Sequence, residues 1–93
     1  DFNTFTPVEY ASGAAEGYRM VDCSIQPSIS SAPYMDLTAI NGPVNGFEKD
    51  EKLLMVCSKG KRAYLVQNRL KFYGYTNTRV LEGGTLFNTS INE

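Results

Sequence analysis

The pattern of apolar and polar positions is clearest in the second half of the chain, where it predicts a strand, a helix and another strand. Residues 53–56 are four consecutive apolar residues between a charged segment and a glycine-containing loop. Such a run is typical of a buried central strand in a parallel sheet. Residues 63–73 carry apolar side chains at helical spacing, with Gly74 as the C-terminal stop. A strand is expected again at residues 77–81. This order predicts a right-handed βαβ unit.

The beginning of the chain carries the signals of a helix start. Thr6 is a candidate N-cap, Pro7 suits the first helical position, and Glu9 completes a capping box with Thr6. We expect this helix to be short, because Gly13 interrupts it and Gly17 ends it.

Between that helix and the buried strand the pattern is less regular. Residues 18–23 alternate partly and include β-type residues, which predicts a strand. Residues 24–45 are rich in Ser, Pro, Gly and Asn, which indicates irregular structure with a brief strand around residues 37–40. Together these segments predict one α/β domain over residues 1–93, with a mainly parallel central sheet flanked by helices.

Composition and charge limit the class of protein. The chain has 93 residues, which suffices for one domain with a modest core. Its net charge of -1 creates no field that attracts nucleic acid or anionic lipid, so we expect neither nucleic acid nor a membrane as a partner. No apolar run approaches the roughly 20 residues that cross a bilayer, and no signal peptide is visible. Two cysteines in such a domain favour a reducing compartment, and a cytoplasmic protein is expected.

The chain contains no histidine. This absence excludes Cys-His and Ser-His dyads, His-ligated metals and imidazole acid–base catalysis. A structural zinc site is not expected either, because two cysteines without a histidine are a poor ligand set. A nucleophilic cysteine in this chain would therefore depend on surroundings that favour its thiolate form.

The loop Cys57-Ser58-Lys59-Gly60-Lys61-Arg62 offers such surroundings. It leads from the carboxyl end of a strand to the N-terminus of a helix, where free N–H groups and the helix dipole attract anions. Gly60 lets the backbone bend, and three cationic side chains add positive charge: Lys59, Lys61 and Arg62. These features favour a thiolate or a persulfide at Cys57. The residue types also fit a buried cysteine before a solvated turn, so both interpretations stay open.

From Lys52 to Phe87 the chain resembles the C-terminal half of a rhodanese homology domain. The family pattern is an apolar strand, Cys-x-x-Gly-x-Arg, an amphipathic helix that ends in Gly-aromatic, a strand and Leu-x-Gly-Gly. This chain has these motifs in the same order and spacing: Leu53-Leu54-Met55-Val56, Cys57-Ser58-Lys59-Gly60-Lys61-Arg62, Gly74-Tyr75 and Leu81-Glu82-Gly83-Gly84. The resemblance implies a rhodanese-like fold. It fits a single-domain sulfurtransferase-like protein or the rhodanese module of a coenzyme A-disulfide reductase-type flavoprotein.

The N-terminal half departs from the family pattern. The family has Asp-Val-Arg after its first long strand, whereas this chain keeps Asp22 but has Ser24 in the place of the Arg. The family segment Gly-His-Ile-Pro-Gly-Ala-x-Asn-x-Pro is matched only by residues 38–43, without the His. The connection from there to Cys57 is short. We therefore expect a shortened N-terminal half, in which a helix is reduced to a turn.

The resemblance implies sulfur transfer. Cys57 would take a sulfane sulfur from a small donor as a persulfide and pass it to a thiol or another nucleophile. Cys57 and Arg62 would be catalytic, and the residues between them would bind the substrate: Ser58, Lys59, Gly60 and Lys61. Asp22 is a candidate supporting residue that hydrogen-bonds loop amides or a nearby cation. No metal and no cofactor is expected in this domain, and a flavin and a nicotinamide cofactor would belong only to a larger fused reductase. A fused or separate disulfide reductase is a candidate partner.

Two other functions stay open at this point. A rhodanese fold can serve as a non-catalytic regulatory or interaction module, which the changed N-terminal motifs favour. A Cys–loop–Arg cradle also suits phosphate, but phosphatase loops of this kind have one residue more between Cys and Arg than this chain has between Cys57 and Arg62. The tighter loop favours a sulfur atom. Cys23 is expected in the core, with a resolving thiol for Cys57 as the alternative.

Overall fold

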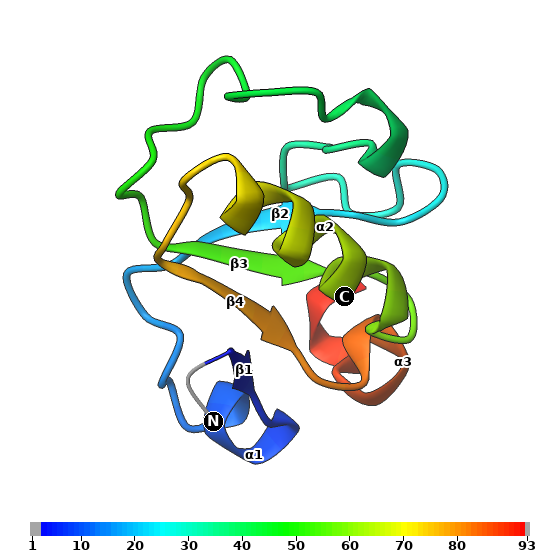
Figure 1. Ribbon diagram of the computed structural model, residues 1–93. Helices are drawn as coiled ribbons and strands as arrows, with labels where there is room; N and C mark the ends of the chain where they lie inside the picture. The colour runs from blue at the N-terminus through cyan, green and yellow to red at the C-terminus, as the bar shows by residue number, and fades with distance from the viewer. Residues whose placement is uncertain (1–2, 93) are drawn as a thin grey trace.

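A parallel four-stranded sheet organises residues 3–92, the part of the chain that the computed structural model describes (Figure 1). The strand order is β1-β4-β3-β2, and all three pairings are parallel. The elements in chain order are β1 (Thr4–Phe5), α1 (Pro7–Ala11), β2 (Arg19–Asp22), the 3₁₀ turn η1 (Leu37–Ala39), β3 (Leu53–Val56), α2 (Lys61–Phe72), β4 (Thr78–Leu81), α3 (Gly84–Phe87) and the 3₁₀ turn η2 (Thr89–Asn92). This architecture confirms the predicted α/β class with a parallel sheet and a short N-terminal half.

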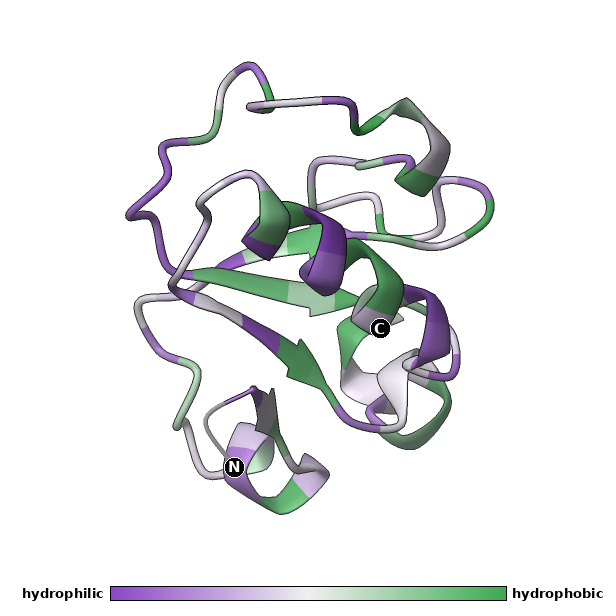
Figure 2. Cartoon of the chain, in the orientation of Figure 1, coloured by the Kyte–Doolittle hydropathy of each residue, from purple (hydrophilic) through white to green (hydrophobic). Residues whose placement is uncertain are grey.

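β3 is the buried centre of the sheet. All four of its residues are buried, and Figure 2 shows the strand as predominantly hydrophobic. Leu53 and Met55 belong to one apolar cluster, together with the buried apolar residues of α2. Leu54 and Val56 belong to a second cluster, which includes Phe5 of β1. Because both faces of the strand are covered, its sequence is continuously apolar rather than alternating.

α2 covers one face of the sheet, where it crosses β3 and β4 (Figure 1). The helix buries a stripe of side chains at helical spacing: Ala63, Val66, Gln67 and Leu70. The opposite face is covered by residues around α1 and near the C-terminus: Tyr10, Ala15, Tyr18 and Ile91. None of the helices within residues 3–92 is long and apolar enough to cross a lipid bilayer.

The first helix starts as predicted but ends earlier. The capping box is present, because the Thr6 hydroxyl accepts a bond from the Glu9 N–H at 3.1 Å and the Glu9 carboxylate accepts one from the Thr6 N–H at 2.8 Å. The predicted end at Gly17 is wrong, since the helix stops at Ala11. Gly13 has a φ of +92°, which is incompatible with a right-handed helix, so the chain turns there.

The predicted brief strand around residues 37–40 is also wrong. Leu37–Ala39 form the 3₁₀ turn η1, and Asp36 is its N-cap. The Asp36 carboxylate accepts bonds from the Thr38 N–H at 3.1 Å and from the Thr38 hydroxyl at 3.0 Å. An aspartate that bonds a backbone N–H two residues further along stabilises a turn in competition with a strand.

The connection between η1 and β3, residues 40–52, contains turns and no helix in the described structure, as predicted. Tyr75, which is buried just after α2, holds this connection in place. Its hydroxyl accepts a bond from the Val44 N–H at 2.8 Å and donates to the Phe47 carbonyl at 3.0 Å. One buried side chain therefore fixes a segment that has no regular structure of its own.

Candidate functional site

Cys57 directly follows Val56, the last residue of β3. Figure 1 shows the carboxyl end of that strand. The neighbouring strand β2 ends at the same edge, because Asp22 is paired with Val56 in the parallel register. The Cys23 N–H continues this pairing with a bond of 2.7 Å to the Val56 carbonyl. Cys57 is 3% exposed, so its thiol lies at the base of a pocket rather than on an open surface.

The Cys57 sulfur accepts two backbone hydrogen bonds from the start of α2. The Gly60 N–H lies 3.0 Å from Sγ, and the Ala63 N–H lies 3.4 Å from it. Gly60 is the N-cap of the helix and, within the described residues, no capping side chain is bonded there. Ala63 is the third helical residue, whose N–H is normally bonded by a capping side chain. The thiol sulfur therefore takes the place of a helix cap, and the two N–H groups favour negative charge on it.

Gly60 can provide this geometry because it has no side chain. Its φ is +96°, a conformation that other residues adopt only with strain. A Cβ built on Gly60 would also lie 3.4 Å from the Gly83 nitrogen, at the turn that follows β4. The loop is therefore closed tightly against the end of the neighbouring strand.

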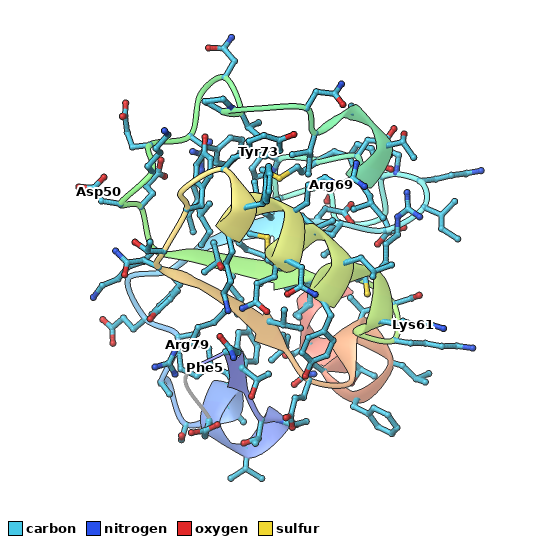
Figure 3. All side chains as sticks on the ribbon, in the orientation of Figure 1. Phe5, Asp50, Lys61, Arg69, Tyr73 and Arg79 are labelled. Carbon is cyan, nitrogen blue, oxygen red and sulfur yellow. The ribbon has the colours of Figure 1, made fainter. Side chains whose placement is uncertain are left out.

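A pocket of about 280 Å³ opens above the thiol. Its lining contains most of the predicted loop residues: Cys57, Ser58, Lys59, Lys61 and Arg62. Gly60 does not line the pocket but holds the sulfur through its N–H. Lys61 extends outward from the start of α2 (Figure 3). Two larger hollows, of about 490 and 680 Å³, lie beside residues 37–41, and neither includes a residue of the loop 57–62 in the described structure.

Arg62 joins the loop to η1. Its Nη2 lies 3.3 Å from Oδ1 of Asp36, the residue that caps the turn. Hydrogen bonds from the Thr38 backbone and side chain, followed by the Arg62 charge, lower the pKa of Asp36 below its usual value. Within residues 3–92, the buried Nε of Arg62 has no hydrogen-bond partner. The guanidinium is thus positioned by one bond and keeps a free donor.

Asp22, the predicted supporting residue, is fully buried but does not line the pocket. Its carboxylate accepts three backbone bonds, from the N–H groups of Ser24 at 3.0 Å, Ser28 at 2.6 Å and Ile29 at 3.0 Å. Burial by itself would raise the pKa of Asp22, but these bonds outweigh it and lower the pKa below its usual value. Asp22 therefore hydrogen-bonds loop amides, and the loop that it holds forms the wall facing residues 57–62.

Sequence reasoning did not assign three residues of this pocket: Ser24, Ile25 and Leu65. The wall at Ser24 and Ile25 is also held by Tyr34, whose hydroxyl lies 2.7 Å from the Ser24 carbonyl and 2.8 Å from the Ile25 carbonyl. One sequence signal for this wall is the position of Asp22, two residues before Ser24. An aspartate commonly accepts a hydrogen bond from the N–H two residues further along the chain, and so forms a turn. That spacing indicates a turn after β2, at the edge where Cys57 lies.

α3 clamps the other side of the loop. The Thr85 N–H donates to the Cys57 carbonyl at 2.9 Å, and the Leu86 N–H donates to the Ser58 carbonyl at 3.0 Å. Gly84 makes this approach possible, because a Cβ there would lie only 2.0 Å from the Cys57 carbonyl oxygen. The Gly83-Gly84 pair thus fixes the backbone that carries the thiol.

Cys23 is fully buried in the cluster beneath α2, and its Sγ lies 3.8 Å from Met55 Sδ. Both cysteines are free thiols. Burial, followed by the proximity of Cys57, raises the pKa of Cys23 to about 12. A thiol with such a pKa is protonated at neutral pH and is a poor nucleophile. These properties favour the core role over that of a resolving thiol.

Comparisons with known proteins identify the family and the fold of this chain. A family model for the rhodanese-like domain matches residues 5–86. Among solved structures, a rhodanese-related protein from Thermoplasma volcanium is 18% identical with a TM-score of 0.75, over 96% of this chain and 92% of that one. A rhodanese homolog from Thermus thermophilus is 28% identical with a TM-score of 0.67, over 88% of this chain and 95% of that one.

A similar unit also occurs within a larger protein. An NAD-dependent persulfide reductase from A. fulgidus is 17% identical with a TM-score of 0.68, over 92% of this chain but 16% of that one. No curated protein is similar enough in sequence to be matched. The likeness to the reductase shows a shared fold for one part of that protein.

Proposed function

This chain belongs to the rhodanese-like domain family, and from that membership we propose that Cys57 accepts a sulfane sulfur as a persulfide and passes it to a thiol or another nucleophile. At the level of the family, a sulfurtransferase-like or related anion-binding function is supported. The observation that carries the finer proposal is the pair of N–H groups, from Gly60 and Ala63, that point at the Cys57 sulfur. They would stabilise a thiolate before transfer and an anionic persulfide after it.

The proposed reaction has two balanced steps. The Cys57 thiolate attacks the outer sulfur of a donor R–S–SH, a new S–S bond forms on Cys57, and the donor S–S bond breaks. Its electron pair leaves on R–S⁻, so the products are Cys57–S–SH and the donor thiolate. In the second step an acceptor thiolate attacks the outer sulfur in the same way and restores the Cys57 thiolate.

The loop cations have distinct roles in this proposal. Lys59 and Lys61 are exposed at the pocket and would attract anionic donors. Arg62 is held by Asp36 and would stabilise negative charge on the sulfur in transfer. The backbone N–H groups of Gly60 and Ala63 complete the anion site. Because the chain has no histidine to act as a base, the thiolate form of Cys57 would depend on these surroundings. Ser58 lines the same pocket beside the thiol.

We further propose a disulfide reductase, fused or separate, as a partner that accepts the sulfur. The support is the similar unit within the persulfide reductase of A. fulgidus. Flavin and nicotinamide chemistry would then reside in the reductase, and this domain would need no cofactor of its own. We place the reaction in the cytoplasm, where thiol acceptors stay reduced.

Intact-protein mass spectrometry after incubation with thiosulfate or glutathione persulfide tests the proposal. We expect a mass increase of one sulfur atom that maps to Cys57 and disappears on treatment with a thiol. The Cys57→Ser variant should show no increase. The Cys23→Ala variant is the matched control and should load sulfur like the wild type.

If the wild type gains no sulfur from either donor, the sulfur-transfer proposal is wrong. The fold would then fit a non-catalytic interaction module or another anion-binding role.

A further inference from the structure

Exposed apolar side chains join the Cys57 pocket to a second hollow beside α2. Leu65 is 48% exposed and lines both the pocket and the hollow of about 680 Å³ that lies between α2 and η1. Ile25 is 77% exposed and lines the pocket, and Phe72 is 82% exposed and lines the second hollow. Large apolar residues that are exposed singly need no explanation, but a connected group of them marks a binding surface.

The second hollow has the form and spacing that a helix would fit. Its two sides are α2 and the segment around η1, which Arg69 joins, since Nη1 of Arg69 lies 3.3 Å from the Leu37 carbonyl (Figure 3). On the α2 side, Leu65 and Phe72 lie two helical turns apart, about 10 Å along the axis. The apolar side chains of a second helix repeat at the same interval, so they can pack against both residues.

The charge around the two hollows has one sign. No acidic residue within residues 3–92 lines either hollow, whereas four of the nine basic residues of the chain do: Lys59, Lys61, Arg62 and Arg69. Arg62 is paired with Asp36, but the other three form no salt bridge with a described residue. The net charge of the whole chain is -1, so positive charge is concentrated on this side of the molecule. A partner that complements this surface is therefore acidic.

We propose that this surface binds an acidic amphipathic helix of a partner protein. We call it the α2 face and define it by Ile25, Leu65, Arg69 and Phe72. The apolar side chains of the partner helix pack against Leu65 and Phe72, and its carboxylates meet Arg69 and the lysines of the neighbouring loop. A bilayer surface would leave the two hollows unfilled, which favours a protein segment over a membrane. This inference goes beyond the proposed sulfur transfer, because the docking does not use the Cys57 thiol.

Fluorescence anisotropy with a synthetic helix tests the docking. The probe is a fluorescein-labelled peptide of about five helical turns, roughly 18 residues, with leucine at helical spacing and glutamate beside each leucine. We expect saturable binding in the micromolar range. The same peptide with lysine in place of glutamate, or with serine in place of leucine, should bind at least about tenfold more weakly. No binding of the acidic peptide, or equal binding of all three peptides, overturns the proposal.

Variants of the protein locate the binding surface. Phe72→Ala and Arg69→Glu should each weaken binding of the acidic peptide about fivefold to tenfold, because one removes an apolar anchor and the other reverses a charge. The matched controls are Val8→Ala, at a residue of α1 that is 78% exposed, and Lys49→Glu, at an exposed position outside both hollows. Both controls should bind like the wild type, and thermal unfolding should show that all four variants stay folded. Equal losses in variants and controls, or no loss in Phe72→Ala and Arg69→Glu, overturn the proposal.

Two variants distinguish failure of the docking from failure of the sulfur transfer. Cys57→Ser should bind the acidic peptide like the wild type, and Phe72→Ala should load sulfur from thiosulfate like the wild type. Loss of peptide binding in Cys57→Ser would place the peptide on the thiol rather than on the α2 face and would overturn the docking alone.

Two measurements exclude other occupants of the α2 face. The protein alone should sediment as a monomer, and it should not bind vesicles of phosphatidylcholine that contain phosphatidylserine. A dimer that Phe72→Ala dissociates would assign the α2 face to a second copy of this chain. Binding to the vesicles that Phe72→Ala abolishes would assign it to a membrane. Both results overturn the proposal.

Discussion

Asp22 shows how a single buried side chain shapes the pocket from outside it. Its carboxylate accepts hydrogen bonds from the N–H groups of Ser24, Ser28 and Ile29. Without these bonds, the N–H groups would lose their protein partner when the loop packs against the sheet. The loop carries Ser24 and Ile25 into the pocket wall. The position of the wall thus depends on one negative charge at the end of β2.

Replacing Asp22 with Asn should destabilise the fold. The amide keeps one oxygen as an acceptor but presents an NH₂ group to N–H donors, so at least one bond is lost and replaced by repulsion. We expect a loss of about 3 kcal/mol in the free energy of unfolding, measured by urea denaturation. Asp50→Asn, a change at an exposed position (Figure 3), is the control and should have little effect.

The same substitution should change the response to acid. Because the pKa of Asp22 is lowered in the folded protein, its contribution is present above its ordinary value of 3.8 and is lost as the pH falls through the lowered pKa. The wild type should therefore lose stability in this acid range, and Asp22→Asn should lose less there. An equal acid dependence in both proteins would show that Asp22 does not carry the effect.

The sequence indicated Cys57 and its loop but could not identify the wall opposite them. The loop residues 57–62 are contiguous, so local geometry explains why most of them line one pocket. Ser24 and Leu65 reach the same pocket because β2 lies beside β3 and α2 starts shortly after β3 ends. That adjacency depends on the sheet order, which no local pattern in the chain specifies.

Among the elements, α3 has the most direct effect on the loop of the thiol. It is four residues long and too short to be stable alone, but its N–H groups bond the carbonyls of Cys57 and Ser58. Gly84 has a φ of +55° and lies against the same carbonyls. The helix and the loop can meet only because no side chain separates them.

Gly84→Ala should separate α3 from the loop. The new Cβ would overlap the Cys57 carbonyl oxygen, and alanine is also strained at this φ. We expect a loss of about 2–5 kcal/mol in unfolding free energy, together with slower sulfur loading of Cys57. Thermal unfolding and mass spectrometry measure the two effects.

Gly42→Ala is the matched control for this change. A Cβ at Gly42 meets no heavy atom of the described structure within 4 Å, so stability and loading should both be retained. If Gly84→Ala behaves like Gly42→Ala, α3 does not support the loop.

The elements that the pattern predicted are those with a strong local signal. The apolar run of β3 and the helical spacing of α2 each determine their own structure. β1 has only two residues and is held by its pairing with β4, so no periodicity could reveal it. η1 was predicted as a strand because its apolar residues outweighed Asp36, whose side chain determines the turn.

At the scale of the whole molecule, Tyr75 connects distant parts of the chain. Its ring belongs to the cluster beneath α2, and its hydroxyl bonds backbone groups of Val44 and Phe47 in the connection before β3. Arg19 adds a second anchor, since its guanidinium lies 4.2 Å from the centre of the Phe47 ring. The connection before β3 is thus held by two side chains, Tyr75 from the segment after α2 and Arg19 from β2.

Tyr75→Phe should loosen this connection without affecting the thiol. The Val44 N–H loses its partner, and we expect the free energy of unfolding to fall by about 1–3 kcal/mol in urea denaturation. Sulfur loading of Cys57 should be unchanged. Tyr10→Phe, which removes a hydroxyl with no hydrogen bond in the described structure, serves as the control. Unchanged stability in Tyr75→Phe would indicate that water replaces the hydroxyl.

The cap that Cys57 provides for α2 has a consequence for how this protein can evolve. A serine at position 57 has about the same size, and its hydroxyl is a preferred acceptor for the free N–H groups at a helix start. A gene copy that lost the nucleophile in this way would still encode a folded domain with the same pocket and cations. Under the proposed function, one substitution therefore separates a sulfur carrier from an anion-binding module, and selection for folding would not prevent that change.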